Sequence, residues 1–160
     1  MKEIPLTQGK VALLHDEDFE WLSGYKWYCS SNGTDDVDKF YAARKNEGNN
    51  KPKSIYMHRM ILGFPTLDVD HVDGNSLNNQ RSNLRTCTRS ENMMNQSKEH
   101  VDGEFKGVYW RKRTEKWRAC IKKDRVQYEL GEYDSKLDAA LAYNAAAQHL
   151  FGEYARLNPI

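Results

Sequence analysis

The sequence predicts an α+β protein made of two small domains, a mixed strand and helix domain over residues 1–96 and a three-stranded antiparallel sheet packed on one helix over residues 105–160. A strand, turn, strand and helix pattern occupies residues 68–95. Three strand-like runs precede a long helical stretch within 105–151. The polar stretch at 97–104 contains a glycine and is typical of a linker. A chain of 160 residues is long enough for two such domains.

Residues 1–50 are expected to form short strands around one helix. The acidic run at 16–18 favours a helix start, because carboxylates complement the positive end of the helix dipole. Phe19 and Leu22 are three positions apart and would face inward on that helix. The expected strands are rich in apolar and aromatic residues and cover 4–6, 10–14, 26–29 and 39–44.

The middle of the chain turns sharply at Asp73-Gly74, a strong short-range turn signal. Met57, Ile61 and Leu62 have helical spacing within a stretch that ends at a glycine. Around the turn, the expected elements are a helix within 54–63, a short strand from 68, an extended segment at 84–87 and a helix start at 90–95.

The second domain is expected to alternate strictly along its middle strand, with Trp117, Ala119 and Ile121 on one face. Its three strands are predicted at 107–110, 116–122 and 126–131, and a helix is predicted from about Ser135, which has N-cap spacing to Asp138. Gly152 would end that helix. The face predicted to pack on the sheet consists of Leu137, Ala140, Leu141, Asn144, Ala147 and Phe151.

Composition indicates a globular protein, with 39% hydrophobic and 29% charged residues. No run of 18 apolar residues is present and the N-terminus lacks the apolar core of a signal peptide, so we expect no membrane partner and a cytoplasmic location. The three cysteines, Cys29, Cys87 and Cys120, are far apart and form no CxxC pair. This spacing argues against a disulfide framework and against a cysteine-rich zinc site.

The net charge of +1 conceals a basic segment. Residues 105–125 carry nine basic side chains and two acidic ones. Such a cluster indicates a polyanionic partner, although a solvated charged face over a small core would have the same composition. No feature of the sequence indicates an obligate protein partner.

Asp70, His71, Asn83 and Asn92 form a constellation suited to phosphodiester hydrolysis. Asn83 follows His71 by twelve residues, and Asn92 follows Asn83 by nine. Carboxylate and amide oxygens suit a hard divalent ion, which can stabilise charge on the phosphate and assist the leaving oxygen. A neutral histidine beside the ion can take the proton from water.

The stretch from Asp70 through Arg85, followed by Glu91-Asn92, resembles the HNH (ββα-metal) nucleases of phage and intron homing endonucleases, and the resemblance covers about 55–95. It implies that His71 is the general base and that Asp70 and Asn92 hold one divalent ion. Asn at the last position favours Mg²⁺ or Mn²⁺ over Zn²⁺.

The same resemblance implies further roles in the first domain. Asn83 would orient the His71 end of the motif, and Arg59 or His58 would lie near substrate phosphates. His58 could instead be a helix residue with a satisfied hydrogen bond. The pattern leaves open whether residues 1–50 complete the sheet of the nuclease domain or add DNA contacts.

Residues 105–158 resemble the APETALA/ethylene-response-factor DNA-binding domain, through Phe105-Lys106-Gly107-Val108-Tyr109-Trp110, Lys116-Trp117-Arg118-Ala119 and the Ala-rich helix. That family folds as three antiparallel strands on one helix and contacts DNA through the sheet. Several family contact positions hold Tyr109, Cys120, Gln127 and Glu129 here, so its sequence preference does not transfer. The residues expected to bind DNA are Lys106, Tyr109, Trp110, Arg111, Arg113, Arg118 and Lys122.

Together these features predict a phage-type, site-preferring homing endonuclease that hydrolyses double-stranded DNA with one divalent metal, most simply Mg²⁺, with Mn²⁺ as the other candidate. Its products would carry 5′-phosphate and 3′-hydroxyl ends. In the host cell it would be associated with the nucleoid when bound to DNA. The alternative is a non-catalytic transcription regulator with a decayed nuclease domain.

Overall fold

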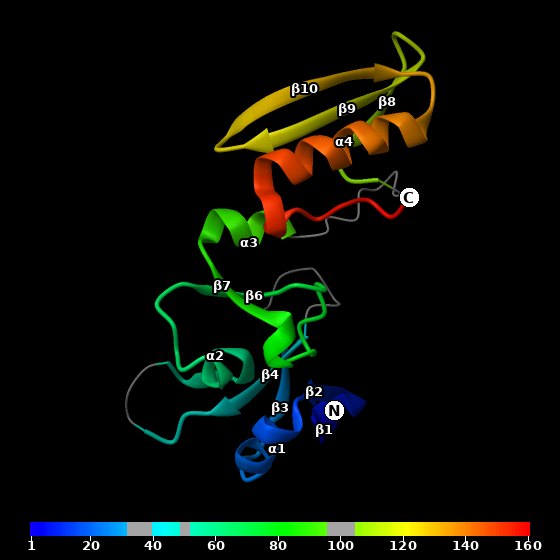
Figure 1. Cartoon of the computed structure of the whole chain (residues 1–160). Helices are drawn as coiled ribbons and strands as arrows, with labels where there is room; N and C mark the ends of the chain where they lie inside the picture. Colours follow the sequence, from blue (N-terminus) through cyan, green and yellow to red (C-terminus); the bar gives the residue numbers. More distant parts are fainter. Residues whose placement is uncertain (32–39, 49–51, 96–104) are drawn as a thin grey trace. The chain divides into compact units, whose positions relative to one another are not determined.

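The computed structural model describes residues 1–31, 40–48, 52–95 and 105–160. The described chain forms two compact units, Met1–Thr88 and Arg89–Ile160. Both units are mixed α/β structures with small antiparallel sheets and few helices (Figure 1). The expected linker at 97–104 lies outside the described residues. Within the described residues, no helix is long and apolar enough to cross a membrane.

The first unit contains three small antiparallel sheets, ordered β1-β2, β3-β4-β5 and β6-β7. Its elements are β1 (Lys2–Pro5), η1 (Thr7–Gly9), β2 (Val11–Leu14), α1 (Asp16–Leu22), β3 (Tyr28–Ser31), β4 (Phe40–Lys45), β5 (Ser54–Tyr56), α2 (Met57–Ile61), β6 (Asp68–His71), η2 (Arg81–Asn83) and β7 (Leu84–Cys87). The segment expected to be one helix over 54–63 is therefore a strand followed by a short helix.

One apolar core joins these sheets. It includes Leu14 and Leu22 from the N-terminal segment, Met57 from α2 and Val69 and Leu84 from β6 and β7. Residues distant in the sequence thus share a single interior, in which the N-terminal segment and the β6-β7 hairpin are packed on the same cluster.

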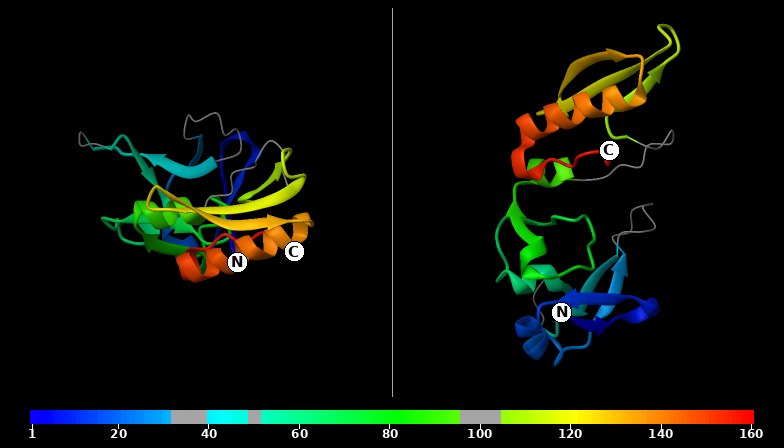
Figure 2. Two further views of the ribbon diagram at one scale, coloured as in Figure 1. Left: turned by 90° about the horizontal axis from the view of Figure 1, so that it is seen from above. Right: turned by 45° about the vertical axis from the view of Figure 1, so that its right-hand side comes forward.

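The second unit is a three-stranded sheet in the order β10-β9-β8, with α4 packed along one face (Figure 2). Its elements are α3 (Arg89–Asn95), β8 (Val108–Arg111), β9 (Lys116–Lys123), β10 (Val126–Tyr133), α4 (Lys136–Phe151) and η3 (Gly152–Tyr154). Ala119 and Ile121 of β9 are buried beneath α4, which confirms the alternation expected for this strand. Ser135 caps α4 by accepting hydrogen bonds from the backbone N–H groups of Leu137 and Asp138, as its spacing predicts.

The predicted packing face of α4 is wrong in part. Leu137 and Leu141 are exposed, and the buried residues of α4 are Ala139, Ala140, Tyr143 and Ala147. Small alanines let the helix backbone lie close to the sheet, and the ring of Tyr143 packs against Gly107. Gly107 has φ +75°, and a Cβ there would lie 2.2 Å from the Tyr143 ring. A glycine is therefore required at this contact.

Candidate active site

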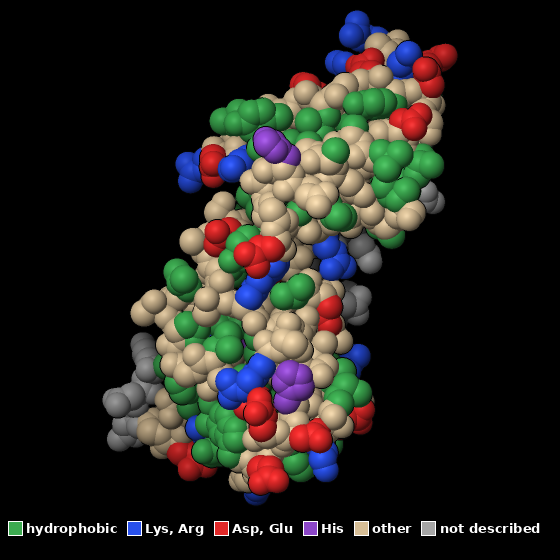
Figure 3. Space-filling view, viewed as in Figure 1, with side chains coloured by type: hydrophobic (Ala, Val, Ile, Leu, Met, Phe, Trp, Pro, Cys, Tyr) green, Lys and Arg blue, Asp and Glu red, His purple; other side chains and the backbone are tan. Residues whose placement is uncertain are grey.

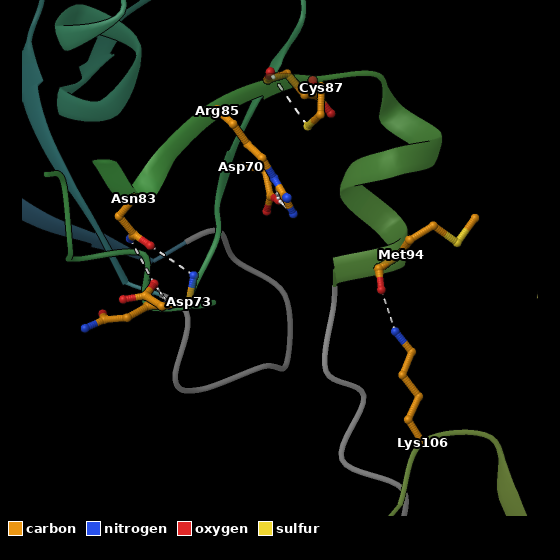
Figure 4. A network of polar contacts seen from close by, with 9 residues as sticks. Asp70, Asp73, Asn83, Arg85, Cys87, Met94 and Lys106 are labelled. Carbon is orange, nitrogen blue, oxygen red and sulfur yellow. Dashed lines mark hydrogen bonds and ion pairs between the residues drawn. The ribbon is translucent and has the colours of Figure 1, made fainter. Parts of the chain in front are cut away.

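Asp70 and His71 lie at the end of β6, where the strand pairs with β7. The register sets Asp70 opposite Arg85 and His71 opposite Leu84. Both polar side chains are buried, Asp70 at 6% and His71 at 5% exposure. Arg85 donates to Asp70 Oδ2 from Nε at 2.9 Å and from a terminal nitrogen at 2.7 Å (Figure 4). The guanidinium offsets the cost of burying this carboxylate.

Asn83 ties together the loop that follows His71. Its amide nitrogen donates to Asp73 Oδ1 at 2.9 Å and to the Asn78 carbonyl at 2.8 Å. Its amide oxygen accepts from the Asp73 N–H at 3.0 Å, and its backbone carbonyl accepts from the Val72 N–H at 2.9 Å. One buried side chain thus fixes both ends of the loop that begins at the base position (Figure 4).

The N-terminal segment supports the same loop from the other side. Leu13 of β2 forms an isolated parallel bridge to Asn78. Its N–H donates to the Leu77 carbonyl at 2.9 Å, and its carbonyl accepts from the Asn79 N–H at 2.8 Å. The backbone around position 13 is therefore part of the structure that holds this loop.

An ion pair with a buried carboxylate adds a second link between the N-terminal segment and the motif. Arg81 donates to Asp18 Oδ2 at 2.9 Å and to Asp18 Oδ1 at 2.7 Å, and the Asp18 side chain is 1% exposed. His15, Glu17 and Asp18 lie close enough together to share a metal ion. Arg81 already supplies the positive charge there, since it also lies 3.6 Å from Glu17. This cluster is better explained as a structural ion pair.

Aromatic rings surround His71. The His58 ring meets it edge-on, with centroids 5.2 Å apart and planes at 72°. The Tyr41 ring lies 5.5 Å from that of His58 and 6.2 Å from that of His71. Tyr56 stacks on His58 at 5.7 Å. Tyr41 of β4 and His58 of α2 therefore flank the ring of His71, and Tyr56 of β5 packs on His58.

Burial keeps His71 neutral near pH 7. Burial is the largest cause that lowers its pKa, and an Asn79 side-chain hydrogen bond and the charges of Asp73 and Asp70 partly oppose it. A neutral imidazole can accept a proton, as a general base must. Asn79 is fully buried, although no sequence pattern distinguishes it from the neighbouring loop asparagines. Its signal was only its place in an Asn-rich turn.

Comparison with known proteins identifies the family. Residues 56–94 match the family model of the HNH endonuclease. The chain is 32% identical over 156 residues to "Uncharacterized HNH endonuclease L560" of Acanthamoeba polyphaga mimivirus, covering 96% of this chain and 77% of that protein. The chain belongs to the HNH endonuclease family. It is also 33% identical over 90 residues to "Protein 3.8" of Escherichia phage T7, covering 55% of this chain and 73% of that protein. No solved structure matches it.

Membership makes this HNH endonuclease a DNA-cleaving enzyme with viral relatives. The alternative of a non-catalytic regulator is therefore not supported. The matched region contains the Asp70, His71, Asn83 and Asn92 positions. Asn92 lies on α3, within the second unit.

Arg59 of the nuclease hydrogen-bonds to the backbone of its own chain. Its guanidinium donates to the Leu67 carbonyl at 3.2 Å and to the Pro65 carbonyl. His58 is 7% exposed, and burial lowers its pKa to about 3, with the charges of His71 and Arg59 acting in the same direction. A buried, neutral His58 does not fit the expected contact with a phosphate.

The outer face of the β8-β9-β10 sheet carries both signs of charge. Arg118 forms an ion pair with Glu129, and Arg111 with Glu132. Lys116 lies 3.1 Å from Asp134. Acidic and basic side chains are intermixed at the end of the sheet where β8 turns into β9 (Figure 3). The basic segment is thus partly neutralised by acidic residues that follow it in the sequence.

The remaining predicted DNA contacts occupy three kinds of place. Tyr109, Arg113 and Lys122 are exposed. Trp110 is exposed as well, but it packs edge-on against Trp117 at 5.2 Å, which places it on the side of the sheet that faces α4. Lys106 donates from Nζ to the Met94 carbonyl at 2.6 Å, and burial lowers its pKa to about 8. Trp110 and Lys106 thus have structural contacts within their own unit.

Proposed function

We propose that this nuclease hydrolyses one phosphodiester bond of duplex DNA per engagement, with His71 as general base and one divalent metal ion held by Asp70 and Asn92. The observation that carries the proposal is the adjacency of the buried Asp70 carboxylate and the buried His71 imidazole at the end of β6, where burial lowers the pKa of the imidazole. Oxygen donors from one Asp and one Asn suit Mg²⁺, or Mn²⁺, better than Zn²⁺.

The chemistry assigned to each residue follows from its contacts. His71 takes the proton of the attacking water at an imidazole nitrogen while the water oxygen bonds to phosphorus and the P–O3′ bond breaks. The departing 3′-oxygen takes a proton from solvent water, so the products carry a 5′-phosphate and a 3′-hydroxyl. When bound, the divalent ion would stabilise charge on the phosphate and on the departing 3′-oxygen. Asn83 acts by fixing the loop from Asp73 to Asn78.

We further propose that the second unit targets the nuclease to DNA, as an APETALA/ethylene-response-factor-like module, and that the enzyme is a site-preferring, homing-type endonuclease. Support comes from the basic side chains on its strands and turns, among them the exposed Arg113 and Lys122 and the half-buried Arg118. Cations on a sheet face can hold phosphates and read guanine edges.

The test is nicking of supercoiled plasmid DNA by the full chain with Mg²⁺, with Mn²⁺ and with EDTA. His71→Ala is the test variant, and His15→Ala is its matched control because His15 is a histidine outside the site. We expect metal-dependent nicking that falls by roughly 10²–10⁴-fold in His71→Ala, the range of general-base contributions, and is unchanged in His15→Ala. Equal cleavage by His71→Ala would refute the assignment of the base.

Targeting is tested separately by measuring DNA binding of Arg118→Ala and Lys122→Ala across a salt series. We expect weaker binding and a shallower dependence on salt, because a variant with one cation fewer releases fewer counterions from the DNA when it binds. Binding that is indifferent to both changes would place the DNA-binding surface elsewhere.

A further inference from the structure

We propose that His58 is a positioning residue for the cleavage reaction. Its buried ring packs against the His71 imidazole and fixes the orientation of that ring. The inference rests on the proposed role of His71 as the base. It replaces the expected contact of His58 with substrate phosphate by a contact with His71.

The geometry gives His58 little freedom to move. Tyr56 stacks on one side of its ring at 5.7 Å with planes at 24°, and Tyr41 contacts it at 5.5 Å. The adjacent residue Met57 is fully buried in the core. Because His58 is held in this way, its edge-on contact at 5.2 Å also restricts the ring of His71.

The chemistry of His58 is unusual for a residue that only fills space. Its Nδ1 is buried and accepts or donates no hydrogen bond among the described residues. An unsatisfied buried polar atom normally destabilises a protein, so its presence calls for an explanation. With a pKa lowered to about 3, the ring stays uncharged near neutral pH. A neutral His58 ring does not repel the positive charge that His71 acquires when it takes a proton.

Orientation of a general base affects the rate of the chemical step more than the affinity for substrate. The proposal therefore predicts a loss in the single-turnover cleavage rate at saturating DNA, with the dissociation constant for DNA unchanged. A small misplacement of a catalytic group can cost about 10²-fold in rate. A role limited to stability would lower the melting temperature and leave the rate of the folded enzyme intact.

The experiment uses the full chain with supercoiled plasmid DNA and Mg²⁺, and compares His58→Ala, His58→Phe and Leu22→Ala. Leu22 is a fully buried core residue outside the ring cluster and controls for lost stability. We expect His58→Ala to cleave roughly 10²-fold more slowly, and His58→Phe, which keeps an uncharged ring, to stay near the wild-type rate. Leu22→Ala should melt earlier and, while folded, cleave normally.

A second arm adds pyrazole, a five-membered ring of similar size to imidazole and far weaker basicity. Pyrazole that occupies the space left in His58→Ala should restore cleavage, whereas it should not restore His71→Ala, which lacks a base. The proposal would be overturned if pyrazole failed to restore cleavage by His58→Ala and His58→Phe were also inactive. Those results would mean that a nitrogen of His58 takes part in the reaction itself. Full activity of His58→Ala beside an inactive His71→Ala would refute only the positioning role. Full activity of His71→Ala would instead refute the underlying mechanism.

Discussion

Replacement of Arg81 by alanine should destabilise the first unit and loosen the loop that follows His71. The Asp18 carboxylate is 1% exposed and receives two hydrogen bonds from Arg81, at 2.9 and 2.7 Å. Arg81→Ala would remove both of these hydrogen bonds and leave the buried charge with the Trp21 indole N–H, 3.2 Å from Asp18 Oδ1. Loss of one partner of a buried pair costs about 3–5 kcal/mol.

The expected cost here is lower, about 2–3 kcal/mol, because the Arg81 side chain is itself 43% exposed and water can approach its position. For a unit the size of residues 1–88 this corresponds to a fall in melting temperature of roughly 10–20 °C. Asp18→Asn in the Arg81→Ala background should recover part of the loss, because the unpaired charge is removed.

Thermal unfolding of the full chain measures the loss of stability. Hydrogen–deuterium exchange of residues 75–83 measures the loosening of the loop that follows His71. Exchange in that segment should rise in Arg81→Ala, while residues 105–160 remain protected and provide an internal control. Glu17→Gln is the matched control, because Glu17 is 70% exposed and its 3.6 Å contact with Arg81 should contribute little. A melting curve for Arg81→Ala that overlays the wild type would contradict the view that this pair supports the motif.

Three further predictions concern acid stability, DNA affinity and alkaline stability. The pKa of His58 is about 3 in the folded protein, against 6.5 for an ordinary histidine. Between these pH values the His58 side chain binds a proton in the unfolded chain but not in the folded one. The free energy of unfolding should therefore fall as the pH drops from 6.5 towards 3. Denaturant titrations of the wild type and His58→Phe at several pH values should show a smaller acid loss in the variant; parallel curves would contradict this. Glu129→Gln should tighten DNA binding at low salt, because it removes an acidic partner of Arg118, which fluorescence anisotropy would detect. Weaker binding would imply that the pair orients Arg118 for contact. Burial lowers the pKa of Lys106 from the ordinary 10.5 to about 8. Burying the charged amine near Met94 therefore lowers the stability of the folded protein below pH 8, and this loss is recovered as the pH rises to 10.5. Wild type should therefore gain stability relative to Lys106→Met across that interval, and a constant difference would rule out this cause.

Local patterns in the sequence were sufficient to predict several elements. The alternation of Ala119 and Ile121 identified β9, and the spacing of Ser135 to Asp138 identified the start of α4, because both signals depend on neighbouring residues alone. The prediction of the buried face of α4 was wrong in part, because it placed large apolar residues against the sheet, where only small residues allow the helix to lie close. Leu137 and Leu141 are larger than alanine, yet only small residues let this helix reach the sheet.

Contacts between distant residues were not predictable in this way. Asp18 and Arg81 are 63 positions apart, and charge alone does not say which acid an arginine will meet. The neutralisation of the basic strands depends on strand register, which shifts between Glu129 and Gly131 in β10. A bulge of this kind changes which side chains lie opposite one another, and its position is set by the folded sheet.

The burial of the polar residues at the active site explains why the nuclease needs its N-terminal segment. Asp70, His71, Asn79 and Asn83 are all buried, and each must be held by partners that offset the loss of water. A β6-β7 hairpin alone cannot exclude water from four polar side chains, because small elements bury too little apolar surface. The N-terminal segment supplies that surface through residues such as Leu14 and fixes the loop through the backbone of Leu13. The functional unit therefore extends beyond the matched residues 56–94. It includes the backbone of Leu13 and the ring of Tyr41, which lies 6.2 Å from that of His71.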